Sequence, residues 1–132
     1  MGGGTKKRIL IVEDDDLMVD LVYAVLTNLG YQVFSAHRME VALINFKQLH
    51  YDLVITDLFM DGMGGVEGIV RISAFGKDIH IIATSAGYKD MPAEKALLAA
   101  RKIGATAALP KPFTPEQLGR IVTEVLDGKP LA

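Results

Sequence analysis

The chain has 132 residues, of which half are hydrophobic, and its formal net charge is −2. This length fits one domain with a substantial core, and the composition excludes a disordered chain. The small net charge gives no reason to expect binding to nucleic acid or to a membrane surface. The chain has no cysteine, which excludes disulfides and thiolate chemistry and is compatible with the cytoplasmic location that we expect. No apolar run in the sequence approaches the roughly 18 residues of a membrane span.

Short aliphatic runs alternate with amphipathic stretches along the chain. The aliphatic runs predict strands at residues 9–12, 31–36, 53–56, 79–84 and 106–109. Apolar residues at helical spacing predict helices over about 17–29, 41–49, 66–72, 90–103 and 115–126. Gly30 and Gly104 are placed to end the first and fourth helices. Thr114, Pro115 and Gln117 form a capping sequence at the start of the fifth.

Five strand–helix units in succession predict a parallel sheet with helices on both faces, because the crossovers are right-handed. The expected fold is an α/β, doubly wound, flavodoxin-like domain with five helices and five parallel strands in the order 2-1-3-4-5. We expect this domain to span residues 7–128. Residues 1–6 are interpreted as a flexible leader and residues 129–132 as a C-terminal tail.

Several polar residues follow the predicted strands directly. Glu13 and Asp14 follow the first strand, Asp57 the third, Ser85 the fourth and Lys111 the fifth. In a parallel sheet these strand ends share one edge, which is where open α/β sheets keep their sites. Carboxylates gathered there repel one another unless a cation or protonation relieves the charge, and Mg²⁺ suits such oxygen ligands. A carboxylate nucleophile, a divalent metal, a lysine and a hydroxyl are the parts of phosphoryl transfer to aspartate.

At this point the sequence resembles the receiver domain of two-component response regulators. The resemblance covers roughly residues 7–126, and the segments that carry it are 9–15, 57–60 with Gly65, 81–86 and 111–113. It implies that Asp57 is the phosphoacceptor and that Ser85 and Lys111 contact the phosphoryl group. It also implies Mg²⁺ ligands from the carboxylates of Glu13, Asp14 and Asp57 and from the carbonyl of Phe59. A cis peptide bond is expected between Lys111 and Pro112.

The sequence departs from the family pattern in four places. Asp61 stands where proline is common, and Gly64 replaces a frequent acidic residue. Ala108 stands where many members have the aromatic residue that moves on phosphorylation. The segment 87–93 is longer than usual, so we expect the loop before the fourth helix to carry part of the conformational change.

The leading interpretation is a signalling phosphoacceptor rather than an enzyme acting on a separate substrate. It would take a phosphoryl group from a histidine kinase or a histidine phosphotransfer protein, change conformation and signal to a downstream protein effector, with phosphotransfer and dephosphorylation catalysed by the domain itself.

Two alternatives belong to other classes. An aspartyl-phosphate phosphatase or a nucleotide-binding enzyme fits less well, because no glycine-rich phosphate loop follows the first strand and no cap domain fits this length. A phosphorylation-independent interaction module of the same fold is favoured by Ala108 and Asp61. The acidic site with Ser85 and Lys111 argues against it.

Overall fold

The structure of the chain is a computed structural model that describes residues 6–59, 64–76, 78–87 and 92–128. Five strands alternate with five helices in this part of the chain. The strands are β1 (Arg8–Val12), β2 (Gln32–Ala36), β3 (Leu53–Asp57), β4 (His80–Ser85) and β5 (Ala107–Pro110). The helices are α1 (Asp16–Asn28), α2 (Met39–Gln48), α3 (Gly65–Ser73), α4 (Ala93–Lys102) and α5 (Pro115–Asp127).

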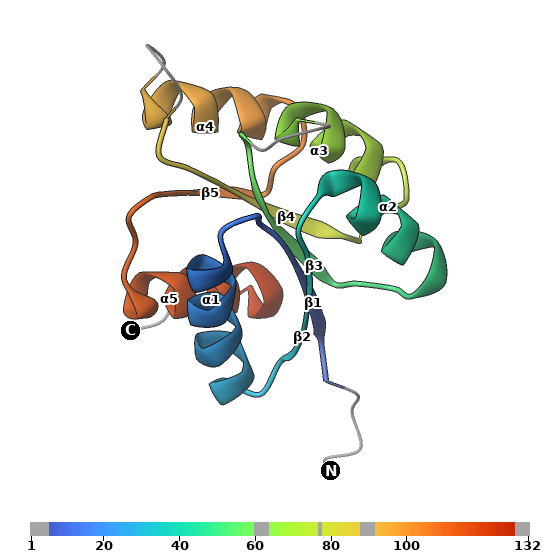
Figure 1. Cartoon of the computed structure of the whole chain (residues 1–132), viewed down its shortest axis with the longest axis vertical. Helices are drawn as coiled ribbons and strands as arrows, with labels where there is room; N and C mark the ends of the chain where they lie inside the picture. Colours follow the sequence, from blue (N-terminus) through green and yellow to red (C-terminus); the bar gives the residue numbers. More distant parts are fainter. Residues whose placement is uncertain (1–5, 60–63, 77, 88–91, 129–132) are drawn as a thin grey trace.

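The strands form one sheet in the order β2-β1-β3-β4-β5, and every neighbouring pair is parallel. Helices α1 and α5 cover one face of the sheet, whereas α2, α3 and α4 cover the other (Figure 1). The predicted fold and strand order are therefore confirmed. The predicted element boundaries differ from the observed ones by only a few residues, as is usual where helix and strand ends fray.

The core consists of two layers because neighbouring residues of a strand point to opposite faces. On β1, Leu10 and Val12 pack with buried residues of α2, α3 and α4, whereas Ile9 and Ile11 pack with those of α1 and α5. All four of these β1 side chains are at most 1% exposed. A strand buried on both faces must be apolar along its whole length, which explains the uninterrupted aliphatic run.

The helix ends follow the predicted signals in most cases. Gly30 and Gly104 have φ angles of 99° and 131°, which glycine adopts without steric cost. Thr114 and Gln117 form both hydrogen bonds of the capping box, with Gln117 N donating to Thr114 Oγ1 over 3.1 Å. Asp15 is the N-cap of α1 and its carboxylate accepts from Leu17 N over 3.0 Å. Of the four consecutive acidic residues at 13–16, Asp15 thus acts as a helix cap.

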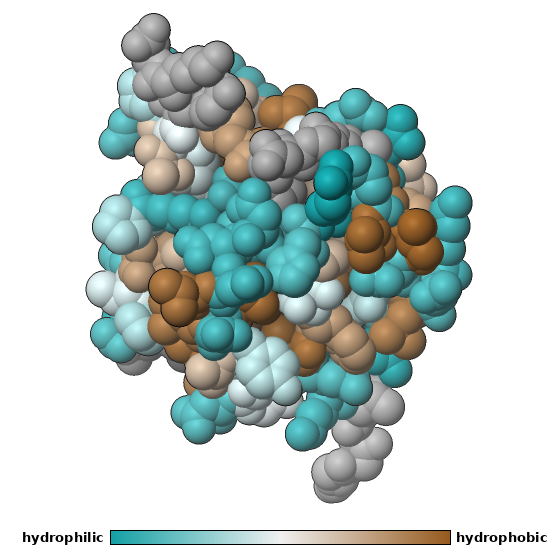
Figure 2. All heavy atoms as spheres, in the orientation of Figure 1, coloured by the Kyte–Doolittle hydropathy of each residue, from teal (hydrophilic) through white to brown (hydrophobic). Residues whose placement is uncertain are grey.

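Hydrophilic residues cover much of the face in Figure 2, with apolar residues scattered among them. Among the residues that the structure describes, the most exposed large apolar one is Leu17, which is 81% exposed. Single exposed apolar residues are normal on a folded domain. Within the described part of the chain, no helix has the length and apolar character needed to cross a membrane.

Some expectations fall on residues outside the described ranges. These are the C-terminal tail at 129–132, all but the last residue of the leader at 1–6, the effect of Asp61 on its loop, and most of the segment 87–93. Asp90, the first residue of the predicted fourth helix, also lies there. Among the described residues, Pro92 is the N-cap of α4.

Candidate functional site

Asp57 is the last residue of β3, at the carboxyl edge of the sheet. Its side chain is 12% exposed, and each of its carboxylate oxygens has its own donor. Phe59 N donates to Oδ1 over 3.0 Å, and Lys111 Nζ donates to Oδ2 over 2.7 Å. The neighbouring backbone is tied to β4, because Leu58 N donates to Thr84 O over 3.0 Å. Asp57 is therefore held in one orientation at the end of a rigid strand.

Glu13 follows β1 directly, and the pairing of β1 with β3 brings it beside Asp57. Its side chain is almost fully buried and has two polar contacts. Oε1 accepts from Lys111 Nζ over 2.6 Å, and Oε2 accepts from Asp15 N over 3.2 Å. Its own N–H donates to Ala36 O of β2 over 3.1 Å. Glu13 is thus fixed by three neighbouring segments.

The ammonium group of Lys111 contacts both carboxylates at once. Burial lowers the pKa of Lys111, but hydrogen bonds to Asp57 and Glu13 and the charges of both outweigh it, so the pKa lies above its ordinary value. The lysine therefore stays protonated and acts as the internal counter-ion of the acidic site.

One ammonium group compensates only one of these two negative charges. Burial raises the pKa of Glu13, whereas Lys111 lowers it through a hydrogen bond and through its charge. The charge of Asp57 raises it again, so the pKa of Glu13 lies above its ordinary value. The raised pKa values of Glu13 and Lys111 are compatible, because burial is the largest cause at Glu13, whereas the two neighbouring carboxylates outweigh burial at Lys111. The site therefore retains an excess of negative charge.

Ser85 ends β4 and is fully buried, opposite Pro110 in the register of β5. Its hydroxyl oxygen accepts a hydrogen bond from Gly87 N over 2.9 Å, and its carbonyl accepts one from Lys111 N over 2.9 Å. The hydroxyl proton is separate from the bond it accepts, so Ser85 can still act as a donor. The structure brings Ser85 to the predicted edge of the sheet, next to the backbone of Lys111.

The residues expected to hold Mg²⁺ lie at the predicted carboxyl edge of the sheet. Across the described ranges, no group of three or more His, Cys, Asp or Glu side chains is arranged to hold a metal ion. Mg²⁺ commonly takes only one or two protein carboxylates and completes its six oxygen ligands with carbonyls, water and phosphate. The paired carboxylates of Glu13 and Asp57, with an excess negative charge and the exposed Asp14 next in sequence, fit this requirement.

Sequence reasoning missed the contact role of Gly65. Its N–H donates to Leu58 O over 3.0 Å, and a Cβ atom at Gly65 would lie 2.6 Å from both Asp57 O and Leu58 Cα. Real Cβ atoms do not make contacts this short, so only glycine lets α3 begin against the end of β3. The family resemblance had singled out Gly65, but it did not show what Gly65 contacts.

A sequence model of the response regulator receiver domain matches residues 9–123, which is most of the chain. The chain belongs to the response regulator receiver family. It is 31% identical over 120 residues to "Chemotaxis protein CheY" of Thermotoga maritima, covering 90% of this chain and 97% of that protein. It is 34% identical over 111 residues to "Transcriptional regulatory protein YvrH" of Bacillus subtilis, covering 83% of this chain but only 45% of that protein.

Solved structures agree with this assignment. A putative response regulator from Chloroflexus aurantiacus superposes with a TM-score of 0.82 at 28% identity, covering 93% of this chain and 99% of that one. Chemotaxis protein CheY4 of Vibrio cholerae gives a TM-score of 0.80 at 28% identity, covering 92% and 100% of the two chains. The cis peptide bond between Lys111 and Pro112, expected from the family resemblance, is present.

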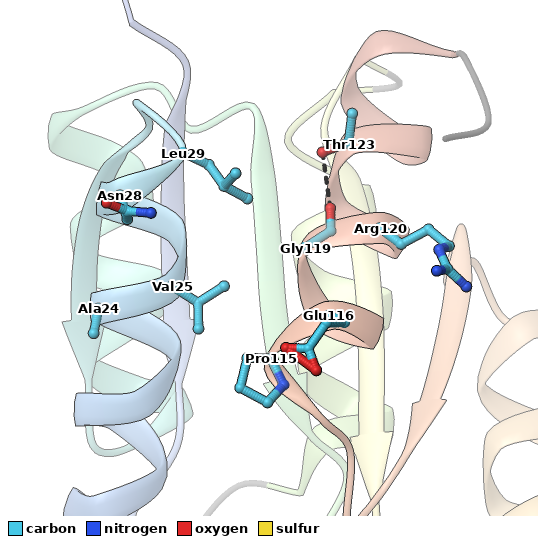
Figure 3. A pocket seen from close by; sticks show the side chains of 9 residues that line it. All are labelled: Ala24, Val25, Asn28, Leu29, Pro115, Glu116, Gly119, Arg120 and Thr123. Atoms are coloured by element: carbon cyan, nitrogen blue, oxygen red, sulfur yellow. Dashed lines mark hydrogen bonds between the residues drawn. The ribbon is translucent and has the colours of Figure 1, made fainter. Parts of the chain in front are cut away.

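The receiver also has a groove of about 560 Å³ between α1 and α5 (Figure 3). Val25 of α1 and Leu29, the C-cap of that helix, point toward α5, where Gly119 leaves the wall open. Arg120 points away. Leu29 and Gly119 are close, since a Cβ at Gly119 would lie 3.3 Å from Leu29 Cδ1. The groove contains no residue of the carboxylate site. Its lining begins on α5 with Pro115, however, and only residues 112–114 separate Pro115 from Lys111.

Proposed function

We propose that this receiver accepts a phosphoryl group on Asp57 with the help of Mg²⁺ and switches conformation to signal to a protein partner in the cytoplasm. The observation that supports this best is the shared contact of Lys111 with Asp57 and Glu13. A carboxylate nucleophile held at a strand end, beside a second acid and a protonated lysine, is suited to phosphoryl transfer.

In the proposed transfer, a carboxylate oxygen of Asp57 attacks the phosphorus of a phosphohistidine. A P–O bond forms as the P–N bond breaks, and the histidine nitrogen keeps the electron pair. Lys111 can then move its hydrogen bond from Asp57 Oδ2 to a phosphoryl oxygen, and the hydroxyl of Ser85 can donate to another. Mg²⁺, when bound by the carboxylates of Glu13, Asp14 and Asp57 and the Phe59 carbonyl, would neutralise charge on the phosphoryl oxygens.

Loss of the phosphoryl group would occur by attack of water on the same phosphorus, which releases inorganic phosphate and restores the Asp57 carboxylate. The domain is then a phosphoacceptor that catalyses its own transfer and hydrolysis, not an enzyme with a separate substrate. Phe59 and Gly87 lie beside Asp57 and Ser85 and are the residues expected to control access of water. We expect Phe59→Asn to change the dephosphorylation rate.

The phosphodonor is expected to be a histidine kinase or a histidine phosphotransfer protein. The groove between α1 and α5 supports docking of such a protein, because an apolar groove between two helices can receive the apolar face of a third. Its Pro115 end is joined to Lys111 by a short loop, so a docked helix would lie near the acceptor. A downstream protein effector would then read the conformational change.

The deciding experiment is the intact mass of the protein after incubation with Mg²⁺ and a small phosphodonor such as acetyl phosphate. We expect one added phosphoryl group, no adduct for Asp57→Asn, and no adduct when EDTA removes the metal. Asp20→Asn is the matched control, because Asp20 is an exposed carboxylate on α1 away from the site, and it should still accept the group.

A mass that stays unchanged, together with no binding of beryllofluoride, would contradict the proposal. That result would favour a phosphorylation-independent interaction module of the same fold. An adduct that persists in Asp57→Asn would place the acceptor elsewhere.

A further inference from the structure

A second hollow lies at the opposite edge of the sheet, where β1 and β2 begin. Its volume is about 530 Å³, within the range of small-molecule sites. Five residues give its wall its charge and its aromatic character: Lys6, Arg8, Tyr23, Tyr31 and Phe34. The strands run parallel from this edge to the one that carries Asp57, so the hollow is separate from the phosphorylation site.

The hollow is positively charged. Lys6 and Arg8 line it, and the described residues of its wall include no carboxylate. Among the described residues, neither Lys6 nor Arg8 forms an ion pair with an acid. The nearby carboxylate of Asp52 accepts from the backbone N–H of Arg8 over 2.8 Å, not from its guanidinium group. Two cations whose charge is not balanced by the protein attract an anion.

The guanidinium group of Arg8 is also oriented. Nε donates to Gln32 Oε1 over 3.3 Å, and an NH group donates to the carbonyl of His50 over 3.4 Å. Both acceptors are neutral, so they fix the direction of the side chain and leave its charge uncompensated. A guanidinium group held in this way can bind a phosphate or carboxylate with little further loss of side-chain entropy.

Aromatic rings form the rest of the wall. Tyr23 is 51% exposed, and the hydroxyl group of Tyr31 is anchored by a hydrogen bond with Thr123 of α5. Phe34 also lines the hollow, but its ring packs edge-to-face against Tyr51 in the core layer under α2, α3 and α4, with ring centroids 5.6 Å apart, so it supports the wall without offering a face. The half-exposed ring of Tyr23 lines this basic hollow and provides a stacking surface for a planar ring. Basic groups and aromatic faces together favour an anion that carries a ring over a simple inorganic ion.

We propose that this hollow is a binding site for a small aromatic anion of the nucleoside monophosphate class. The phosphate contacts Lys6 and Arg8, and the base stacks against Tyr23. This site is independent of the proposed phosphorylation, because the side-chain hydrogen bonds of Asp57, Glu13 and Lys111 within the described part of the chain involve no residue of the hollow.

The test is a titration of the ¹⁵N-labelled protein with AMP, followed by backbone amide chemical shifts. EDTA is present throughout, so that phosphate is not drawn to the carboxylate site by metal. Adenosine supplies the ring alone and inorganic phosphate the anion alone. We expect saturable shifts at the start of β1, at Tyr23 and at Gln32, with binding of AMP at least about tenfold tighter than binding of either fragment.

Three variants test the contacts. Lys6→Gln and Tyr23→Ala change exposed side chains, so they keep the fold, and each should weaken AMP binding several-fold. Arg8→Gln should weaken it about tenfold, although it also removes two hydrogen bonds. Arg101→Gln removes an exposed cation from α4 and should leave binding unchanged. Asp57→Asn should also bind AMP normally, which separates this proposal from the phosphoacceptor function.

Three outcomes would overturn the proposal. They are the absence of saturable shifts with AMP, shifts confined to the carboxylate edge, and equal binding of AMP by the protein and by its Lys6→Gln and Tyr23→Ala variants.

Discussion

The ammonium group of Lys111 lies 2.7 Å from Asp57 Oδ2, in the place where a transferred phosphoryl group would need a positive charge. The same group lies 2.6 Å from Glu13 Oε1. In the resting protein, Lys111 therefore compensates the negative charge of Asp57. After phosphoryl transfer, Lys111 is proposed to contact the phosphoryl group on the same residue. Under the proposed function, this contact would link the stability of the domain to metal binding and to phosphorylation through one side chain.

Replacing Lys111 with methionine should lower the stability of the protein. The apolar stem is kept, but two neighbouring carboxylates lose their shared cation, and we expect a loss of about 1–3 kcal/mol at neutral pH. Mg²⁺ should then raise the melting temperature of the variant more than that of the parent, because the metal replaces the missing charge. Thermal unfolding with Mg²⁺ and with EDTA measures both effects.

Lys95→Met is the control for Lys111→Met, since Lys95 is exposed in the middle of α4. It should change stability by less than about 0.5 kcal/mol. Equal stability of Lys111→Met and the parent in EDTA would show that the contact with Asp57 and Glu13 contributes nothing.

The contact between Gly65 and the end of β3 gives a second prediction. In Gly65→Ala, the added methyl group would lie 2.6 Å from Asp57 O, so backbone must move. We expect a loss of stability of about 1–3 kcal/mol and slower phosphorylation of Asp57 by a small donor. Gly64→Ala is a closely matched control, because a Cβ atom there meets nothing within 4 Å. If both variants behave alike, the position of Asp57 does not depend on Gly65.

The packing of α2 against α3 gives a third prediction. A Cβ atom at Gly68 would lie 2.7 Å from Cγ and Sδ of Met39, which is fully buried. Gly68→Ala should destabilise by about 1–3 kcal/mol through overpacking, and Met39→Ala by about 2–5 kcal/mol through a cavity. In the double variant the new methyl group enters the space left by methionine. The stability lost by the double variant should therefore be at least about 1 kcal/mol smaller than the sum of the losses of the two single variants. Urea unfolding of all four proteins measures the coupling, and strict additivity would contradict it.

Tyr51 provides a prediction about alkaline pH. Burial raises the pKa of Tyr51 above its ordinary value of 10.0, although the charge of Arg8 lowers it in part. Between these two pKa values the native protein holds a proton that the unfolded chain releases, so the free energy of unfolding falls as pH rises. Burial raises the pKa of Tyr31 too, which adds a loss of the same sign.

Tyr51→Phe should therefore make the free energy of unfolding fall less steeply with pH above about 10, while the contributions of Tyr31 and of Lys111, whose pKa values are also raised, remain. Urea unfolding of the variant and the parent from pH 8 to 11 measures the slopes. Between pH 8 and 9 the two slopes should agree, which serves as the internal control. A variant that follows the parent up to pH 11 would show that Tyr51 does not titrate differently in the folded protein.

The sequence predicts the strand ends well because a parallel sheet leaves little freedom. Once 9–12 and 53–56 are identified as neighbouring strands, Glu13 and Asp57 must lie side by side. The sequence does not predict that one ammonium group contacts both, because the path of the Lys111 side chain depends on the backbone between β5 and α5. It likewise cannot distinguish Asp15, which caps α1, from Asp14 and Asp16, since aspartate is a suitable N-cap at each of these positions.

Glycine contacts are even less accessible to sequence reasoning. Gly64 and Gly65 are adjacent and identical in type, yet a side chain fits at one and not at the other. The difference arises from how closely α3 approaches β3, which is a property of the packed structure. The hollow near Arg8 is likewise a property of the packed structure. Its lining comes from three segments, at residues 6–8, 23–27 and 31–34, and no local sequence motif marks it.

The groove between α1 and α5 gives the last prediction, which separates chemistry from docking. Gly119→Met places a side chain into the groove, and the flexible Leu29 side chain opposite can yield, so the fold should be retained. Glycine is also about 1 kcal/mol less favourable than a good helix former inside α5, which further offsets any strain. Phosphorylation by acetyl phosphate should then keep its parent rate, because Asp57 and Lys111 are untouched. Transfer from a phosphorylated histidine phosphotransfer protein that serves the parent should slow about tenfold or more.

Leu98→Met, on the exposed face of α4, is the control and should leave both rates unchanged. If both donors phosphorylate Gly119→Met as fast as the parent, the groove is not where the donor docks. If both slow equally, the substitution has disturbed the acceptor site, and only selective loss of the protein donor supports docking between α1 and α5.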